Sequence, residues 1–189
     1  MPNPIVALVE KELERFEVFW EANPLLFPGQ DNLYPIPFFG DIRKAEVLTL
    51  ALNPAWTEFS KGGRYERHWI PGLDACALTT RLLHYFDLPV PPPHQWFDYR
   101  RNAMELLSCS YERNAAHIDL FSFPTKLRNV LNETQRRTVG RLIETQSKSR
   151  LADLLQLASN AKLMLVVDYT FSKSDGATAK TFDFICLSI

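Results

Sequence analysis

Residues 46–54 read Glu46-Val47-Leu48-Thr49-Leu50-Ala51-Leu52-Asn53-Pro54, a short apolar run that ends at an Asn-Pro pair. A run of this length, bounded by a charge and a turn, is typical of a strand that is buried on both faces, as in a parallel sheet. A second such run lies at residues 115–121 and a third at Leu163–Val167. We therefore expect these three segments to be strands of one sheet.

Helical patterns separate the three apolar runs. The predicted helices are residues 4–22, 74–86, 95–107 and, in two pieces, 132–159. Asn23-Pro24 ends the first helix, and Asp74 is a candidate cap for the second. The segment at 24–40 is rich in proline and aromatic residues, so we expect an irregular strap there. The tail at 177–189 fits either a strand or a helix.

This alternation of helices and strands predicts one α/β domain. It would span residues 1–189, with a helix and strap at 1–40 and an α/β core at 45–189. Right-handed crossovers would place helices on both faces of a mostly parallel central sheet. Ligands of such folds bind at the carboxyl ends of the strands. Attention therefore falls on the loops that follow the predicted strands.

Composition and charge exclude several classes of protein. The chain has 189 residues, of which 46% are hydrophobic and 23% charged, which is typical of a soluble globular protein. A net charge of −1 gives no overall attraction to nucleic acid or to a membrane surface. The apolar runs are too short to span a bilayer, and no basic signal region opens the sequence. Three widely spaced cysteines argue against a disulfide framework, so a cytoplasmic location is expected.

The sequence lacks the motifs of several enzyme classes. It has no P-loop, no dinucleotide-binding GxGxxG, no zinc-binding HExxH and no GxSxG nucleophile motif. The four histidines are scattered, without the spacing of metal ligands. We therefore expect neither a metal ion nor another cofactor.

The loop after the first predicted strand offers a polar amide beside flat apolar rings. Asn53 can both donate and accept hydrogen bonds, and Pro54 would hold its amide in place. Trp56 and Phe59 could each stack on a nucleobase. A simple Asn-Pro turn, with both aromatic rings in the core, is the alternative interpretation.

The second predicted strand places two titratable residues on one face. His117 and Asp119 alternate with apolar neighbours, and a buried polar pair of this kind can titrate or hold a water molecule. A structural His–Asp pair is the alternative. An unrelated small hydrolase would use the same pair together with a nucleophile such as Ser122.

A basic and aromatic stretch at residues 61–69 is the best local candidate for contact with nucleic acid. Lys61, Arg64 and Arg67 could bind phosphate groups. A solvated loop is the alternative interpretation of the same residues.

The residues at 47–55 and 117–125 resemble two motifs of the uracil-DNA glycosylase superfamily. The closest form is the mismatch-specific uracil/thymine branch, in which a buried strand ends in Gly-x-Asn-Pro-Gly. Leu163–Val167 is similar in placement to that branch's third strand. The resemblance implies a three-layer α/β/α sandwich with a four-stranded parallel sheet. It also implies that a base is flipped out of DNA and that water hydrolyses its N-glycosidic bond without a cofactor.

The resemblance also assigns roles to individual residues. It gives Asn53 the task of orienting the attacking water, and it gives Phe59 or Trp56 that of stacking on the base. The pocket would be completed by His117 and Asp119. DNA, or a small base-like ligand, is the expected partner.

Two departures from the family pattern keep an alternative open. Ala51 and Ala55 stand where the branch has glycine, and the last family motif is not found in the sequence up to Ile189. The alternative is a truncated or diverged member that binds a base, a nucleotide or another small ligand without cleaving it. If no strand follows Leu163–Val167, that segment would be an exposed sheet edge, which favours a dimer.

Overall fold

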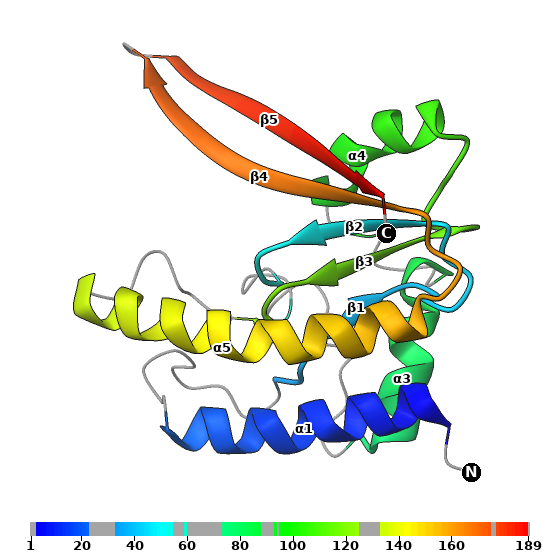
Figure 1. Ribbon diagram of the computed structural model, residues 1–189, viewed down its shortest axis with the longest axis vertical. Coiled ribbons are helices and arrows are strands. Elements are labelled where there is room, and N and C mark those ends of the chain that lie inside the picture. Colours follow the sequence, from blue (N-terminus) through cyan, green and yellow to red (C-terminus); the bar gives the residue numbers. More distant parts are fainter. Residues whose placement is uncertain are drawn as a thin grey trace.

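A five-stranded sheet lies at the centre of the protein (Figure 1). The computed structural model describes residues 3–22, 33–54, 59, 73–87, 93, 95–124, 133–174 and 177–188. The strands are β1 (Phe38–Phe39), β2 (Val47–Ala51), β3 (Ala115–Asp119), β4 (Leu163–Ser174) and β5 (Ala177–Ser188). Their order across the sheet is β1-β3-β2-β4-β5.

The three predicted strands are confirmed and form the middle of the sheet. Strand β2 runs parallel to both of its neighbours, so Thr49 lies opposite His117 on β3 and opposite Leu165 on β4. The α/β class is therefore confirmed. The prediction of a mostly parallel sheet is wrong at both edges, because β1 pairs antiparallel with β3 and β5 pairs antiparallel with β4. The sheet is mixed.

Four α-helices and one short 3-10 helix surround the sheet in the described part of the chain. They are α1 (Pro4–Ala22), α3 (Ala75–Leu83), η3 (Tyr85–Asp87), α4 (Gln95–Leu106) and α5 (Glu133–Leu157). The predicted Asp74 cap is confirmed, since its Oδ1 accepts a hydrogen bond of 2.7 Å from the Ala77 amide. The division of the long helix into two pieces is wrong. Gly140 in α5 weakens a helix without breaking it, and α5 contains no proline.

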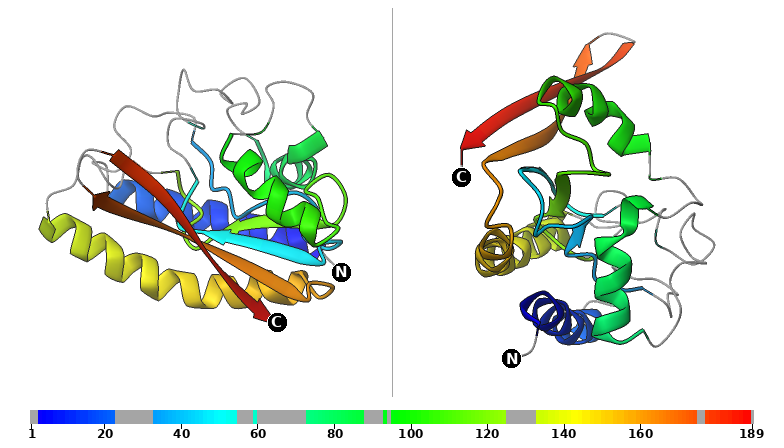
Figure 2. Two further views of the ribbon diagram at one scale, coloured as in Figure 1. Left: turned by 90° about the horizontal axis from the view of Figure 1, so that it is seen from above. Right: turned by 90° about the vertical axis from the view of Figure 1, so that its right-hand side faces the viewer.

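The helices cover both faces of the sheet (Figures 1 and 2). Helices α1 and α5 lie side by side below β2 and β3 in Figure 1, and Lys11 forms an ion pair of 2.8 Å with Asp153 between them. Helix α4 covers the opposite face. Helix α3 packs against α1 and beside β1.

The buried stripe of α1 differs slightly from the one predicted by the apolar residues at steps of three and four, which are Ile5, Val9, Leu13, Phe16 and Trp20. Its buried residues are Ile5, Leu8, Val9, Glu12, Phe16 and Phe19. Leu13 and Trp20, which the pattern placed on the stripe, are partly buried beside it. The stripe therefore includes a carboxylate, Glu12.

The irregular strap is only partly as expected. Residues 23–32 lie outside the described residues, whereas Phe38–Phe39 form strand β1. The Phe39 ring packs 4.7 Å from that of Tyr85 and 5.5 Å from that of Phe97, so the strap does place aromatic rings on the core.

Strands β4 and β5 form a long hairpin that projects beyond the rest of the sheet (Figure 1). Only Leu163–Val166 of β4 pairs with β2, whereas all of β4 pairs with β5. The ambiguous tail is thus a strand, and the hypothesis of an exposed edge at Leu163–Val167 is wrong. The edge of the sheet on this side is β5.

Candidate functional site

The carboxyl ends of β2 and β3 lie side by side, as the parallel pairing requires. The Leu120 amide donates to the Ala51 carbonyl, and the Phe121 amide donates to the Leu52 carbonyl, both at 2.8 Å. The loops that follow the two strands therefore begin at one place, with Asn53 beside the end of β3. This juxtaposition is the one the α/β rule predicts for a ligand site.

Asn53 is half-buried, and its amide is fixed by its own loop. Nδ2 donates a hydrogen bond of 2.9 Å to the Pro54 carbonyl, and Pro54 is buried. Because the NH2 group is held in this way, the amide plane is fixed and Oδ1 can accept a hydrogen bond from a water molecule or a ligand.

Of the aromatic and basic candidates in and after the first loop, the structure describes only Phe59. Phe59 is only 3% exposed and packs 5.9 Å from Phe39, so its ring belongs to the core rather than to an open stacking surface. Trp56 lies outside the described residues, as do the three basic candidates Lys61, Arg64 and Arg67. Their predicted roles stay predictions.

His117 and Asp119 do share one face of β3, and they belong to a network of buried polar groups. Nε2 of His117 lies 3.3 Å from Oδ1 of Asp119, and Nδ1 lies 2.8 Å from the Thr49 hydroxyl. The Thr49 hydroxyl is in turn 2.8 Å from the Tyr111 hydroxyl. All four side chains are buried. Polar groups in a core need such partners, so this network fixes β2, β3 and the Tyr111 turn relative to one another.

Helix α4 packs against this network of polar groups. The imidazole of His117 lies 4.5 Å from the Trp96 ring and 5.4 Å from the Phe97 ring, measured between centroids. The contact of 3.3 Å between His117 Nε2 and Asp119 Oδ1 does not have hydrogen-bond geometry, so this buried oxygen has no hydrogen-bond partner in the described structure. In this arrangement both side chains are buried beneath α4, which favours the structural alternative that the sequence left open, and their catalytic role stays a prediction.

The arrangement does not support a hydrolase that uses Ser122 as its nucleophile. The Ser122 hydroxyl donates to the carboxylate of Glu12 instead of lying against His117. The hydroxyl that does contact the imidazole belongs to Thr49, which is fully buried and out of reach of a substrate.

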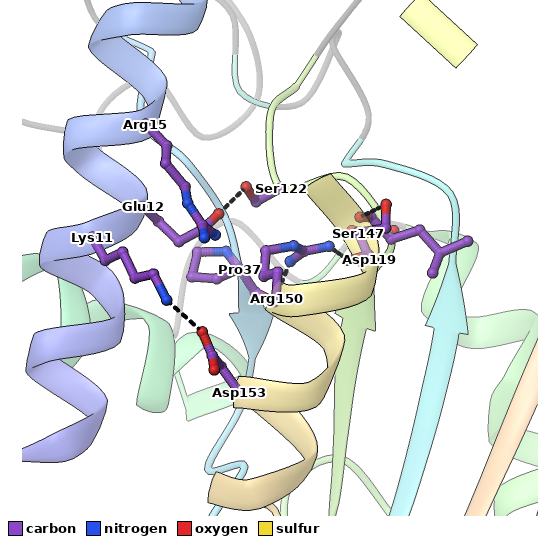
Figure 3. Close-up of polar contacts among 10 residues, drawn as sticks. Lys11, Glu12, Arg15, Pro37, Asp119, Ser122, Ser147, Arg150 and Asp153 are labelled. Carbon is purple, nitrogen blue, oxygen red and sulfur yellow. Dashed lines mark hydrogen bonds and ion pairs between the residues drawn. The ribbon is translucent and has the colours of Figure 1, made fainter. Parts of the chain in front are cut away.

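A second buried network holds the end of β3 from the opposite face (Figure 3). Arg150 on α5 donates to the backbone carbonyl of Asp119 and, at 3.4 Å, to that of Pro37. Ser147, one turn earlier on α5, donates at 2.7 Å to the Leu120 carbonyl. These bonds satisfy backbone groups where β3 ends and the loop begins.

Helix α1 completes this second network with a buried carboxylate. Glu12 accepts hydrogen bonds from the Ser122 hydroxyl and, at 2.7 Å, from Arg15. Burial lowers the pKa of the Arg150 guanidinium, and the nearby carboxylates of Glu12 and Asp119 oppose that shift. The side chains of Glu12, Arg15, Ser122 and Arg150 line a small hollow beside Leu120.

Sequence reasoning missed both Glu12 and Arg150, although a signal for each existed. Glu12 falls on the apolar stripe of α1, three residues after Val9 and four before Phe16. Arg150 likewise lies four residues before Leu154, which is fully buried. A charged residue in the middle of an apolar stripe indicates a buried charge that needs partners.

The phenol of Tyr111 gives a test of the network that joins His117, Thr49 and Tyr111. Burial raises the pKa of Tyr111 above its usual range, and the hydrogen bond to Thr49 opposes only part of that rise. The folded protein thus favours the neutral phenol. Its contribution to stability is complete below the unfolded pKa of about 10 and is lost as the pH rises above it.

We expect the free energy of unfolding to fall by about 1.4 kcal/mol per pH unit above pH ~10 because of this group alone. Tyr111→Phe should remove that part of the slope. Urea unfolding of both proteins between neutral pH and the alkaline range measures the difference. Equal slopes in the two proteins would contradict the buried neutral phenol.

No family model, curated protein or solved structure matches the chain. Within the described residues, no group of three or more His, Cys, Asp or Glu side chains is arranged to hold a metal ion. In the same part of the chain, no helix has the length and apolar character needed to cross a membrane.

Proposed function

We propose that this chain is a uracil-DNA glycosylase-like protein that binds a flipped base at the carboxyl ends of β2 and β3 and hydrolyses its N-glycosidic bond. The observation that carries the proposal is the position of Asn53. It follows the central strand, its amide is fixed by the Pro54 carbonyl, and it lies beside the end of β3. This agrees with the role that the resemblance to that superfamily gives to Asn53.

In the proposed reaction, Asn53 orients a water molecule through Oδ1. The water oxygen attacks the sugar carbon that bears the base, the N-glycosidic bond breaks, and the base leaves with the bonding electrons. The proton that the water loses on forming the new C–O bond neutralises the departing base. Fixed dipoles around a dry site stabilise the charge that develops on the leaving base and on the sugar. The buried networks on both faces of β3 hold the strand ends that position Asn53.

A second candidate function is binding of a base without cleavage. The burial of His117 and Asp119 favours it, because neither side chain can transfer a proton to a ligand while enclosed by α4. The two candidates share the site and differ in the chemistry that follows binding.

Excision of uracil distinguishes the two candidates. Labelled single-stranded and duplex DNA with one uracil is incubated with the parent protein and with Asn53→Ala. If Asn53 orients the water, the rate of uracil release should be about 10²–10³-fold lower in the variant, as is typical when one positioning dipole is removed. Asn102→Ala, which alters an exposed amide on α4, is the matched control and should cut as the parent does.

The outcomes are separable. A parent protein that releases no uracil but binds DNA with an uncleavable uracil analogue, in an Asn53-dependent way, supports the binding candidate. Cleavage that is equal in the parent and in Asn53→Ala would overturn the role of Asn53. Absence of both cleavage and binding would overturn the proposed function as a whole.

A further inference from the structure

Strand β5 is a long sheet edge whose backbone is open on one side. It lies last in the strand order, and no other strand of the described structure pairs with its outer side. Every residue from Ala177 to Ser188 pairs with one residue of β4, so the ladder runs without a bulge. The outer side of β5 therefore presents an uninterrupted row of backbone donors and acceptors.

This edge lacks most of the features with which proteins usually prevent strands from pairing with another chain. Such edges are short, bulged, or interrupted by proline and charges. The segment Ala177–Ser188 contains no proline and no glycine, and its only charged residues are Lys180 and Asp183, which cancel. The opposite edge of the sheet is different, because β1 has only two residues.

The outer half of the hairpin also has too few neighbours in the sheet. Beyond Val166, β4 pairs with β5 alone, and this two-stranded part extends past the end of β2 (Figure 1). A two-stranded ribbon is at best marginally stable in water, whereas three or more strands can stabilise one another. An additional strand along β5 would meet that need.

We propose that β5 pairs antiparallel with β5 of a second copy of this chain, so that one sheet runs through both copies. An antiparallel edge is complementary to itself across a two-fold axis, which is the symmetry of most protein dimers. Since the strand has no net charge, two copies can approach without repulsion.

The sequence of β5 favours a register centred on Phe182. This register places Phe182 opposite its counterpart in the second copy, and aromatic pairs across strands are stabilising. Lys180 then lies opposite Phe184 and Asp183 opposite Thr181, so neither charge faces its like. The same register pairs the whole of residues 177–187.

Charge substitutions at the axis test the proposal. Sedimentation velocity over a range of concentrations should show a dimer for the parent chain. Phe182→Lys and Phe182→Glu each place two like charges opposite each other, so each should weaken dimerisation about tenfold or more. The matched control is Tyr169→Lys, because Tyr169 is the β4 partner of Phe182 in the same ladder pair but lies one strand away from the axis.

Mixing separates a lost interface from a damaged hairpin. An equimolar mixture of Phe182→Lys and Phe182→Glu should recover the dimer, because opposite charges then meet at the axis. The proposal is overturned by a parent chain that stays monomeric up to its solubility limit, by a dimer that Phe182→Lys does not weaken, or by a mixture that stays monomeric.

Disulfide formation tests the register. In a background with Cys76→Ser and Cys186→Ser, Phe182→Cys should cross-link two copies under mild oxidation. Thr181→Cys should not, because in this register the two cysteines are offset diagonally by roughly 7–8 Å. Cross-linking through Thr181→Cys but not through Phe182→Cys would overturn the register centred on Phe182.

Discussion

Arg150→Ala should lower the free energy of unfolding by about 3–5 kcal/mol, the cost of breaking a buried charged network. Arg150 is 4% exposed, and its guanidinium donates to the backbone carbonyls of Asp119 and Pro37 (Figure 3). Alanine leaves two buried acceptors without donors and removes a cation that lies near the Glu12 carboxylate. A loss of this size is a large fraction of the stability of an ordinary domain, about 5–15 kcal/mol.

Two variants of α5 make this measurement specific. Lys148→Ala removes a cation two residues earlier, but that side chain is 79% exposed, so the change should stay within about 0.5 kcal/mol. Arg150→Lys keeps the charge but has no planar fork to reach two carbonyls, so it should fall between the parent and Arg150→Ala. Urea denaturation gives all four free energies. An Arg150→Ala loss no larger than that of Lys148→Ala would contradict the network.

The effect of Arg150→Ala should be local as well as global. The Leu120 and Phe121 amides bond to the Ala51 and Leu52 carbonyls just where Arg150 holds the β3 backbone. Hydrogen exchange at these two amides should therefore accelerate more than exchange inside α4. These hydrogen bonds connect Arg150 through the end of β3 to the loop that contains Asn53.

The sequence predicts those elements whose signal is local. The apolar runs at residues 46–52, 115–121 and 163–167 each predict a strand because a short apolar run ends at a turn, and a strand is found at each of them. Helices α1, α3 and α4 follow from apolar residues at steps of three and four. The parallel pairing of β2 with β3 then follows from the alternation, and with it the juxtaposition of the loops that follow the two strands.

Other features depend on contacts between distant residues and could not be predicted in this way. Phe38–Phe39 becomes a strand because the backbone of β3 pairs with it, although a two-residue segment in a proline-rich stretch has no strand pattern of its own. Strand β5 returns antiparallel because it forms a hairpin with β4, whereas its sequence alone fits a helix as well.

The candidate site shows the same division. The alternation of polar and apolar residues placed His117 and Asp119 on one face of the strand. It could not show that α4 encloses them or that the Thr49 hydroxyl forms a hydrogen bond with the His117 ring. That knowledge requires tertiary packing. It favours support of the strand ends as the role of the pair, whereas proton transfer by the pair stays a prediction.

Glu12→Ala is the second substitution for which we expect a large effect, a loss of about 2–4 kcal/mol in the free energy of unfolding. The carboxylate is 2% exposed and accepts from the Ser122 hydroxyl and from Arg15. Without it, the buried Ser122 hydroxyl has lost its acceptor and the buried Arg150 has lost a compensating negative charge. Glu14→Ala, which alters an exposed carboxylate on the same helix, should change the free energy of unfolding by less than about 0.5 kcal/mol.

A double-mutant cycle between Glu12 and Arg150 decides whether the two buried charges act as one network. If they do, the double variant should lose less than the sum of the two single losses, with a coupling of about 1–3 kcal/mol. The reason is electrostatic, since each single change leaves the opposite charge buried and uncompensated, whereas the double change removes both. Strictly additive losses would mean that α1 and α5 hold the end of β3 independently, through Ser122 on one side and the Asp119 carbonyl on the other.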